Sequence, residues 1–445
     1  MEEQQVELIE RILEDKNLDY AIEAVLKNKG AAGVDKMTVY ELRHYFQKNK
    51  AEIKEQIRNK KYQPQPVRRV YIPKPNGDKR PLGIPTVVDR VVQQAVAQVL
   101  SKGYERYFSK YSYGFRPNRN AHMAIEQTIL CLNEGYEWVI DIDIEKYFDT
   151  VNHDKLISIL REKINDAPTL NLIRKFLRAG IMDGGLISES TMGVPQGGPL
   201  SPILSNVYLD KLDKELENRE LRFARYARYA DDCNIFVKSE RAADRVIKSI
   251  TQWLEKKLRL KVNLTKSKVV RPTKSEFLGF SFYKSSNQAG WRCRPAKNRK
   301  KRLKGKIKTV LCRRKAVARP LEDTITKLNQ IIMGWINYYR ISDMKNFLKE
   351  FSPWMRHKLR VVIMKMWKRP KTKYKRLSQL RNYLKCNISD EQIRQVANSR
   401  LGLYRQCGMS VVNFLLSPEV LEKKIGNKPA LINPLKYYEK QRLSL

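Results

Sequence analysis

One stretch of alternating apolar and acidic residues decides the fold, and it reads Trp138-Val-Ile-Asp-Ile-Asp-Ile-Glu-Lys-Tyr-Phe-Asp-Thr-Val-Asn-His153. The isoleucines at positions 140, 142 and 144 alternate with Asp141 and Asp143. This period of two predicts a strand with one apolar face and one face that carries two carboxylates. A helix is expected to follow from about Lys146. Carboxylates in such apolar surroundings indicate chemistry rather than solubility.

A second acidic segment, Phe223-Ala-Arg-Tyr-Ala-Arg-Tyr-Ala-Asp-Asp-Cys-Asn-Ile-Phe-Val237, has β-forming flanks around two aspartates. The pattern predicts a hairpin with Asp231 and Asp232 at its turn. Alone, the pair could be ordinary turn formers. Together with Asp143 on a neighbouring strand, however, Asp231 could hold hard divalent cations through oxygen ligands. Mg²⁺ suits such a site, and two ions would clamp both oxygens of a phosphoryl transfer, which points to a nucleotidyl transferase.

The composition narrows the class of partner. The 445 residues include 88 Lys and Arg against 47 Asp and Glu, a formal net charge of +41. This length suggests two to four domains, and the excess positive charge favours a polyanion, with nucleic acid ahead of an anionic membrane surface. No long apolar run or secretory signal is present, so we expect a soluble intracellular protein, cytoplasmic and of bacterial type, with no membrane partner. Six scattered cysteines and four histidines argue against a zinc site.

The positive charge is concentrated. No acidic residue occurs between Glu276 and Glu322, nor between Phe351 and Ser389. The first stretch predicts a basic loop that leads into a basic helix, and the second an amphipathic helix with a cationic outer face. A single run of this kind could be a solvated face. Two in one chain favour a long track for nucleic acid.

At this point the chain resembles the group II intron-encoded reverse transcriptases and maturases, in the compact form without an endonuclease domain. The motifs occur in the order of that family: Tyr71-Ile-Pro-Lys-Pro-Asn-Gly77, Arg80-Pro-Leu-Gly-Ile-Pro85, Tyr113-Gly-Phe-Arg-Pro-Asn118, Asp143-Ile-Glu-Lys-Tyr-Phe-Asp149, Pro195-Gln-Gly-Gly-Pro-Leu-Ser-Pro202, Tyr229-Ala-Asp-Asp232, Phe277-Leu-Gly-Phe280 and Gly334-Trp-Ile-Asn-Tyr-Tyr-Arg340. Their ordered co-occurrence is far more specific than any one of them.

The resemblance implies an α+β right-hand polymerase, with fingers and palm built from an antiparallel sheet and helices, then an α-helical thumb and a small basic C-terminal domain. We expect fingers and palm at 1–289, with an N-terminal helical extension at about 1–60. The thumb, or maturase, domain would span 290–370 and a DNA-binding domain 371–445. No cysteine-rich cluster follows the basic tail, so an endonuclease is not expected.

The resemblance also assigns a metal site. Asp143 and Asp231 would bind two Mg²⁺ ions, for which Mn²⁺ is a possible substitute, the backbone carbonyl of Ile144 would contribute, and Asp232 would complete the acidic triad. Lys266 matches a lysine that protonates the leaving pyrophosphate, although a structural ion pair would give the same pattern.

Other motifs are assigned to the substrates. Lys74 and Arg80 would grip the triphosphate of a dNTP, Phe148 would exclude a ribose 2′-hydroxyl, and Gln196 would contact the nucleotide. The template and primer would be bound by Arg116, Gly197, Tyr229, Phe277, Leu278, Gly279 and Arg340. A surface hairpin, a plain loop and a buried hairpin are the ordinary alternatives for these motifs. One departure from the family is that Ala224-Arg-Tyr226 is repeated at once as Ala227-Arg-Tyr229. The repeat puts the strand register in doubt unless a bulge or a longer loop absorbs it.

We therefore expect an RNA-directed DNA polymerase that is also a maturase. Its partners would be a group II intron RNA, an RNA template with a DNA or RNA primer, target DNA and dNTPs, and it would serve splicing and retrohoming of a mobile element. Two alternatives stay open: a free-standing host, defence or repair reverse transcriptase, and an RNA-binding splicing cofactor without polymerase activity.

Overall fold

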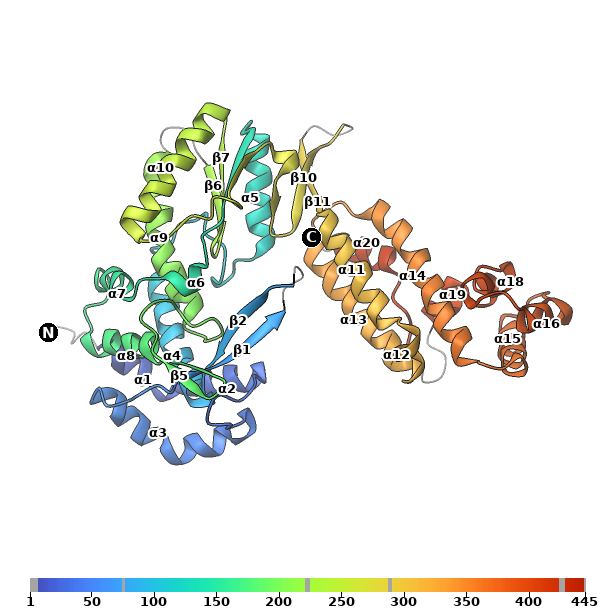
Figure 1. Cartoon of the computed structure of the whole chain (residues 1–445), viewed down its shortest axis with the longest axis horizontal. Helices are drawn as coiled ribbons and strands as arrows, with labels where there is room; N and C mark the ends of the chain where they lie inside the picture. The colour runs from blue at the N-terminus through green and yellow to red at the C-terminus, as the bar shows by residue number, and fades with distance from the viewer. Residues whose placement is uncertain (1–6, 74–76, 221–224, 287–289, 424–428, 444–445) are drawn as a thin grey trace. The chain divides into compact units, whose positions relative to one another are not determined.

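The structure is a computed structural model that describes residues 7–73, 77–220, 225–286, 290–423 and 429–443 (Figure 1). The chain divides into two compact units, Met1–Leu278 and Gly279–Leu445, and each is described by itself. The mixture of helices with antiparallel strands in the first unit, and the mainly helical second unit, agree with the predicted α+β class. No helix among the described residues is both long enough and apolar enough to cross a membrane.

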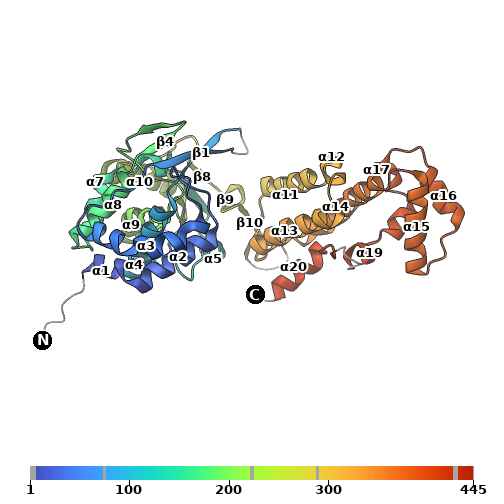
Figure 2. The same cartoon turned by 90° about the horizontal axis from the view of Figure 1, so that it is seen from below.

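The first unit begins with a layer of helices: α1 (Leu8–Leu13), α2 (Asp15–Asn28), the 3₁₀ turn η1 (Val39–Glu41) and α3 (Leu42–Arg58). These lie beside α4 (Val87–Tyr104) in Figure 2. The buried residues of α2 are Leu18, Ala21, Ile22 and Val25, spaced three and four apart, so one apolar stripe of α2 packs against α4. Further helices of this unit are α5 (Ala121–Asn133), α6 (Tyr147–Thr150), α7 (His153–Arg161), α8 (Ala167–Arg178), α9 (Ser201–Glu220) and α10 (Glu240–Leu258).

The central sheet carries both acidic segments. Its order is β6 (Arg225–Tyr229), β7 (Asp232–Val237), β3 (Trp138–Ile142) and β8 (Lys268–Val270), and all neighbours are antiparallel. Ile140 and Ile142 are buried, while Asp141 is only half-buried, as the alternation predicts. The helices α6 and α7 follow β3, as expected.

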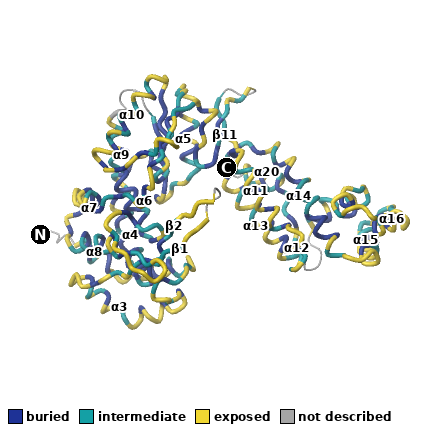
Figure 3. Tube along the Cα trace, viewed as in Figure 1, coloured by how far each residue is buried: buried dark blue, intermediate teal, exposed yellow. Residues whose placement is uncertain are grey.

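A second sheet in the same unit has the order β2 (Lys79–Ile84), β1 (Val67–Pro73), β4 (Ile181–Asp183) and β5 (Leu186–Ser188). The pair β1–β4 is parallel and the other pairs are antiparallel. Exposure rises along the β1–β2 hairpin toward its tip, where Figure 3 shows it in yellow. The turn η2 (Pro272–Lys274) and β9 (Glu276–Phe277) come last in this unit.

The second unit opens with an antiparallel hairpin, β10 (Phe280–Lys284) and β11 (Trp291–Pro295), and is otherwise helical. The helices are α11 (Lys297–Val310), α12 (Arg313–Val317), α13 (Leu321–Tyr339), α14 (Lys345–Met366), α15 (Pro370–Leu384), α16 (Asp390–Asn398), α17 (Leu403–Gln406), α18 (Ser410–Leu415), α19 (Pro418–Glu422) and α20 (Pro434–Leu443). Leu303 and Ile307 form the buried side of α11, which packs against α13.

The final helix packs against two earlier helices of this unit. The helix α20 packs against α13 and α14, and the Tyr438 hydroxyl donates a hydrogen bond to the Ser342 carbonyl at 2.9 Å. The helices α15, α16 and α18 pack on one another. The segment expected at 371–445 therefore contributes to two packed groups of helices, and its boundary at 371 stays a prediction.

Candidate active site

The acidic hairpin is a tight turn. Tyr229 pairs with Asp232 at the end of the β6–β7 ladder, which leaves Ala230 and Asp231 as a two-residue turn. Ala230 has a φ of +57°, a value that residues with a Cβ atom adopt only at a cost. The ladder is regular from Arg225 to Tyr229, so no bulge absorbs the repeated tripeptide among these described residues. Ala224, the first residue of the repeat, lies outside the described residues.

Asp143 lies at the same edge of the sheet as this turn. In the antiparallel pair β3–β7, Ile142 faces Cys233, so Asp143 and the Asp231–Asp232 pair are the next residues on the two strands. The backbone N–H of Asp143 donates to Ser267 Oγ at 3.0 Å, and its carbonyl accepts from the N–H of Asn263 at 2.8 Å. The loop that follows α10 therefore fixes the backbone of Asp143.

The pKa of Asp231 also indicates that Asp143 and Arg80 lie close to the turn. Burial raises the pKa of the Asp231 carboxyl, the negative charge of Asp143 raises it further, and the positive charge of Arg80 lowers it. A half-buried acid whose neighbours are another acid and an arginine is a common feature of functional sites.

The oxygen donors at this edge fit a hard divalent cation. Ile144 forms an antiparallel bridge with Val262. The two hydrogen bonds of this bridge are made by the neighbouring residues: the Glu145 N–H donates to the Lys261 carbonyl, and the Asn263 N–H donates to the Asp143 carbonyl. The Ile144 carbonyl is therefore outside this ladder and can serve as a ligand.

A cation already approaches this group of oxygens. The Lys266 ammonium lies 3.7 Å from Asp143 Oδ2. Within the described ranges, no group of three or more Asp, Glu, His or Cys side chains is arranged to hold a metal ion. Asp143, Asp231 and the Ile144 carbonyl form a donor set of the kind that Mg²⁺ completes with water and substrate phosphates.

A second group of predicted residues meets beside the turn. Arg80 Nε on β2 donates to Gln196 Oε1 at 2.9 Å, and the Gly83 N–H donates to the Gln196 carbonyl at 2.8 Å. Phe148 and Gln196 line a cavity of about 460 Å³. Lys74, the other residue predicted to contact phosphate, lies outside the described residues. The described part of the predicted nucleotide site is therefore brought together from β2, α6 and the loop after β5.

The backbone of Gly197 lies directly against β2. Its φ is +126°, and a Cβ atom there would lie 2.5 Å from the Gly83 carbonyl oxygen. A Cβ atom on Gly198 would lie 2.2 Å from Gln93 Oε1. Both glycines let the loop approach β2 and α4, which positions Gln196.

Arg116 faces the protein interior. Its guanidinium donates to Glu105 Oε1 at 2.7 Å and to Glu105 Oε2 at 3.1 Å, and to the Ser112 carbonyl at 2.7 Å. The side chain is 2% exposed, so it stabilises its own loop and does not present a cation to nucleic acid.

The neighbouring Phe115 is the residue of this motif that sequence reasoning missed. It is 52% exposed at a φ of +55°, and its ring centroid lies 6.3 Å from that of the half-buried Tyr229. An exposed aromatic ring in this position can stack on a base or ribose. The order of residues in the motif gives no sign of which side chain faces outward.

The remaining predicted residues are the consecutive run from Phe277 to Gly279, and Arg340. Phe277 is buried, and Leu278 and Gly279 have φ values of +50° and +83°. A Cβ atom on Gly279 would lie 2.8 Å from the Tyr339 hydroxyl. Arg340, at the end of α13, is half-buried, and its Nε has no hydrogen-bond partner among the described residues. Roles in binding primer or template stay predictions for these four.

Comparison with known families confirms the resemblance. Residues 72–282 match the family model for reverse transcriptase (RNA-dependent DNA polymerase), and residues 300–382 match the group II intron, maturase-specific domain. The chain combines a reverse transcriptase domain with a group II intron maturase domain. The reverse transcriptase domain contains both acidic segments and the Arg80–Gln196 contact, and it confirms the right-hand polymerase class. The maturase match covers most of α11, all of α12 to α14, and most of α15.

Curated relatives agree with these domains. The chain is 40% identical to protein YkfC of Escherichia coli over 220 residues, 48% of this chain and 58% of that protein. It is 42% identical to the group II intron-encoded protein LtrA of Lactococcus lactis over 173 residues, 39% of this chain and 29% of LtrA. It is 45% identical to the putative COX1/OXI3 intron 2 protein of Saccharomyces cerevisiae over 157 residues, 35% of this chain and 18% of that protein. The chain thus spans a little more than half of YkfC and less than a third of each of the other two relatives. A reverse transcriptase domain implies the use of a divalent metal ion.

Proposed function

We propose that the protein is an RNA-directed DNA polymerase that extends a primer on an RNA template, and a maturase that binds a group II intron RNA. One observation carries the polymerase proposal: Asp143 and the Asp231 turn share one edge of the sheet, beside the Arg80–Gln196 contact, within a reverse transcriptase domain. Such an edge places carboxylate oxygens next to a group that binds phosphate, which nucleotidyl transfer requires.

In this proposal the acids hold two Mg²⁺ ions, or Mn²⁺ in their place. Asp143 and Asp231 would be shared ligands, with the Ile144 carbonyl and Asp232 as further donors. When bound, the ions would lower the pKa of the primer 3′-hydroxyl and offset the charge of the triphosphate.

The residues around the acids would handle the nucleotide. The guanidinium of Arg80 would bind triphosphate oxygens, together with Lys74, and Gln196 would orient Arg80 through their 2.9 Å contact. Phe148 would exclude a 2′-hydroxyl, since its ring lines the cavity that also contains Gln196. The primer oxygen would attack the α-phosphate, and Lys266 would protonate the pyrophosphate that leaves.

The basic helices would bind the nucleic acid along its phosphates. The helix α11 carries eight cations: Lys297, Arg299, Lys300, Lys301, Arg302, Lys304, Lys306 and Lys308. We assign fingers and palm to 1–289, the thumb and maturase domain to 290–370 and DNA binding to 371–445. Tyr229, Gly197 and the Phe277-Leu-Gly279 segment would lie along the primer and template, and intron RNA and target DNA would be the natural partners of the maturase and DNA-binding regions.

Two experiments test the proposal. Purified protein is incubated with a DNA primer annealed to an RNA template, dNTPs and MgCl₂, and we expect extension that stops when EDTA is added. Absence of extension with both Mg²⁺ and Mn²⁺ would leave the splicing-cofactor alternative. For the maturase function, RNA that copurifies with the protein is sequenced, and we expect enrichment of a group II intron. Active polymerase without such RNA would favour the free-standing reverse transcriptase.

A further inference from the structure

An ion pair that is fully buried lies directly behind the acidic turn. Arg228 is on β6 and Asp213 on α9, and both side chains have an exposed fraction of 0%. Arg228 Nε donates to Asp213 Oδ1 at 2.7 Å, and Arg228 Nη2 donates to Asp213 Oδ2. Burial alone would lower the pKa of Arg228, but the carboxylate of Asp213 more than offsets this and raises it. The arginine therefore stays charged inside the domain.

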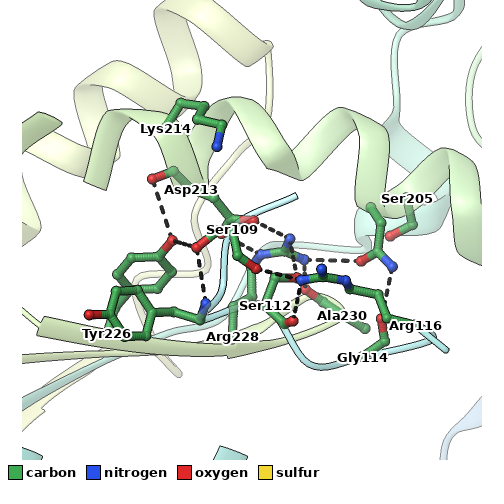
Figure 4. A network of polar contacts seen from close by, with 12 residues as sticks. Ser109, Ser112, Gly114, Arg116, Ser205, Asp213, Lys214, Tyr226, Arg228 and Ala230 are labelled. Atoms are coloured by element: carbon green, nitrogen blue, oxygen red, sulfur yellow. Dashed lines mark hydrogen bonds and ion pairs between the residues drawn. The ribbon is translucent and has the colours of Figure 1, made fainter. Parts of the chain in front are cut away.

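The same guanidinium also binds three other residues, of which Figure 4 labels Ala230 and Ser112. Its Nη1 donates to the Ala230 carbonyl at 2.8 Å, and its Nη2 donates to Ser112 Oγ at 2.8 Å. A longer contact of 3.3 Å joins Nη1 to Asn206 Oδ1 on α9, and the Asn206 amide donates to the Gly114 carbonyl at 2.8 Å. A single side chain thus links α9, the loop at 112–114 and the turn between β6 and β7.

Of these contacts, the one with Ala230 lies nearest to Asp231, the proposed metal ligand. Its carbonyl belongs to the peptide bond that joins Ala230 to Asp231, and Ala230 holds a φ of +57°. Type I′ and II′ turns usually place glycine, asparagine or aspartate at such positions, because a Cβ atom disfavours them. A turn built with alanine needs support from outside the turn. The Arg228 guanidinium supplies a charge-assisted hydrogen bond from the interior.

The strand that bears Arg228 is itself held in place. The backbone N–H of Arg228 donates to the Tyr111 carbonyl at 3.0 Å, and the Arg228 carbonyl accepts from the Tyr113 N–H at 2.9 Å. The guanidinium therefore starts from a backbone that cannot easily shift. We propose that Arg228 is a positioning residue, whose guanidinium holds the Ala230–Asp231 turn and so sets where the Asp231 carboxylate lies. This inference rests on the proposed polymerase function.

The alternative is that the pair serves stability only, and a double substitution separates the two roles. Replacing a buried ion pair by apolar residues of similar volume often leaves a fold intact or stabilises it. Arg228→Met combined with Asp213→Leu removes both charges and the bond to Ala230. Arg228→Lys is measured beside it, because lysine keeps a cation near Asp213 but cannot reproduce the fork that also reaches Ala230.

Three quantities are measured for each variant: the thermal unfolding midpoint, the rate of primer extension at saturating dNTP, and the half-saturating Mg²⁺ concentration. We expect cooperative unfolding, a fall of about a hundredfold in rate, as for a displacement of about 1 Å in an active site, and a higher Mg²⁺ requirement. The matched control is Ile57→Ala on α3, a buried residue of the N-terminal layer. It should lower the unfolding midpoint and leave the Mg²⁺ requirement unchanged.

The outcomes are distinguishable from a failure of the polymerase proposal. Wild-type rate and Mg²⁺ requirement in either folded variant would show that the pair is structural only, and would overturn the inference. If the wild type itself does not extend primers, the proposed function fails. The inference is then decided by Mn²⁺ binding, followed by electron paramagnetic resonance, which needs no turnover. Binding weakened in Arg228→Lys but not in Ile57→Ala supports it, and equal binding overturns it.

Discussion

Replacement of Gly114 by alanine tests how tightly the acidic turn is held. A Cβ atom at Gly114 would lie 2.4 Å from the Ala230 nitrogen, 3.0 Å from the Tyr229 carbonyl carbon and 3.2 Å from the Ala230 Cα atom. All three are backbone atoms, so no side-chain rotation relieves the contact. The turn and the loop must separate by about 1 Å to reach an ordinary contact distance.

The size of the effect follows from that displacement. The overpacking should cost about 1–3 kcal/mol of the free energy of unfolding, which a domain of this size tolerates. A shift of about 1 Å in a group that positions reactants can cost about a hundredfold in rate. We therefore expect Gly114→Ala to fold and to extend primers about a hundredfold more slowly than the wild type.

The assay is single-turnover incorporation of one dNTP on an RNA template, with the unfolding midpoint measured on the same sample. The control is Gly103→Ala near the end of α4, where an added Cβ atom meets nothing within 4 Å. This change should be neutral or stabilise by up to about 1 kcal/mol. A rate for Gly114→Ala within threefold of the wild type would refute a rigid turn whose position matters to the chemistry.

Two further predictions concern a buried acid and the sugar gate. Burial, followed by the charge of Asp213, raises the pKa of Asp210 from 3.8 to about 6, and its Oδ1 has no hydrogen-bond partner among the described residues. The fold thus favours the neutral form of Asp210. The neutral acid contributes about 3 kcal/mol to the free energy of unfolding below about pH 4, and this contribution is lost as the pH rises through about 6. The free energy of unfolding of Asp210→Asn and of wild type is measured with urea at pH 4 and at pH 7.5. Relative to wild type, the variant should be more stable at pH 7.5 than at pH 4 by about 3 kcal/mol. The same stability difference at both pH values would contradict this prediction. Phe148→Ala should raise rNTP incorporation relative to dNTP in primer extension, and unchanged discrimination would contradict the gate.

The sequence predicted what depends on short-range pattern. Alternation around Asp141 and Asp143 reports directly which side chains face the core, because the period of a strand is two. Two aspartates between β-forming flanks likewise predicted the hairpin at Asp231. Both features follow from residues close together in the chain, and the structure has both. The turn itself differs by one residue from the prediction, because Ala230 and Asp231 form it and Asp232 begins β7.

What escaped prediction depends on contacts between distant segments. Arg116 and Phe115 are adjacent, yet Glu105 draws the arginine inward while the left-handed backbone of Phe115 turns its ring outward. Gly197 packs against Gly83, more than a hundred residues away. Nothing near Arg228 in the sequence identifies Asp213 as its partner. Such pairs are set by tertiary packing, which a single sequence does not record.

The most direct test of the central claim is primer extension by Asp231→Asn. The substitution keeps the size of the side chain and removes the charge that would bind a divalent cation, while the β6–β7 turn retains its backbone contacts. Asp244→Asn, on the exposed side of α10, is the matched control. We predict that Asp231→Asn unfolds at the wild-type temperature or above and gives no detectable extension with Mg²⁺, while Asp244→Asn extends normally. Extension by Asp231→Asn at the wild-type rate would contradict the assignment of this turn as the active site.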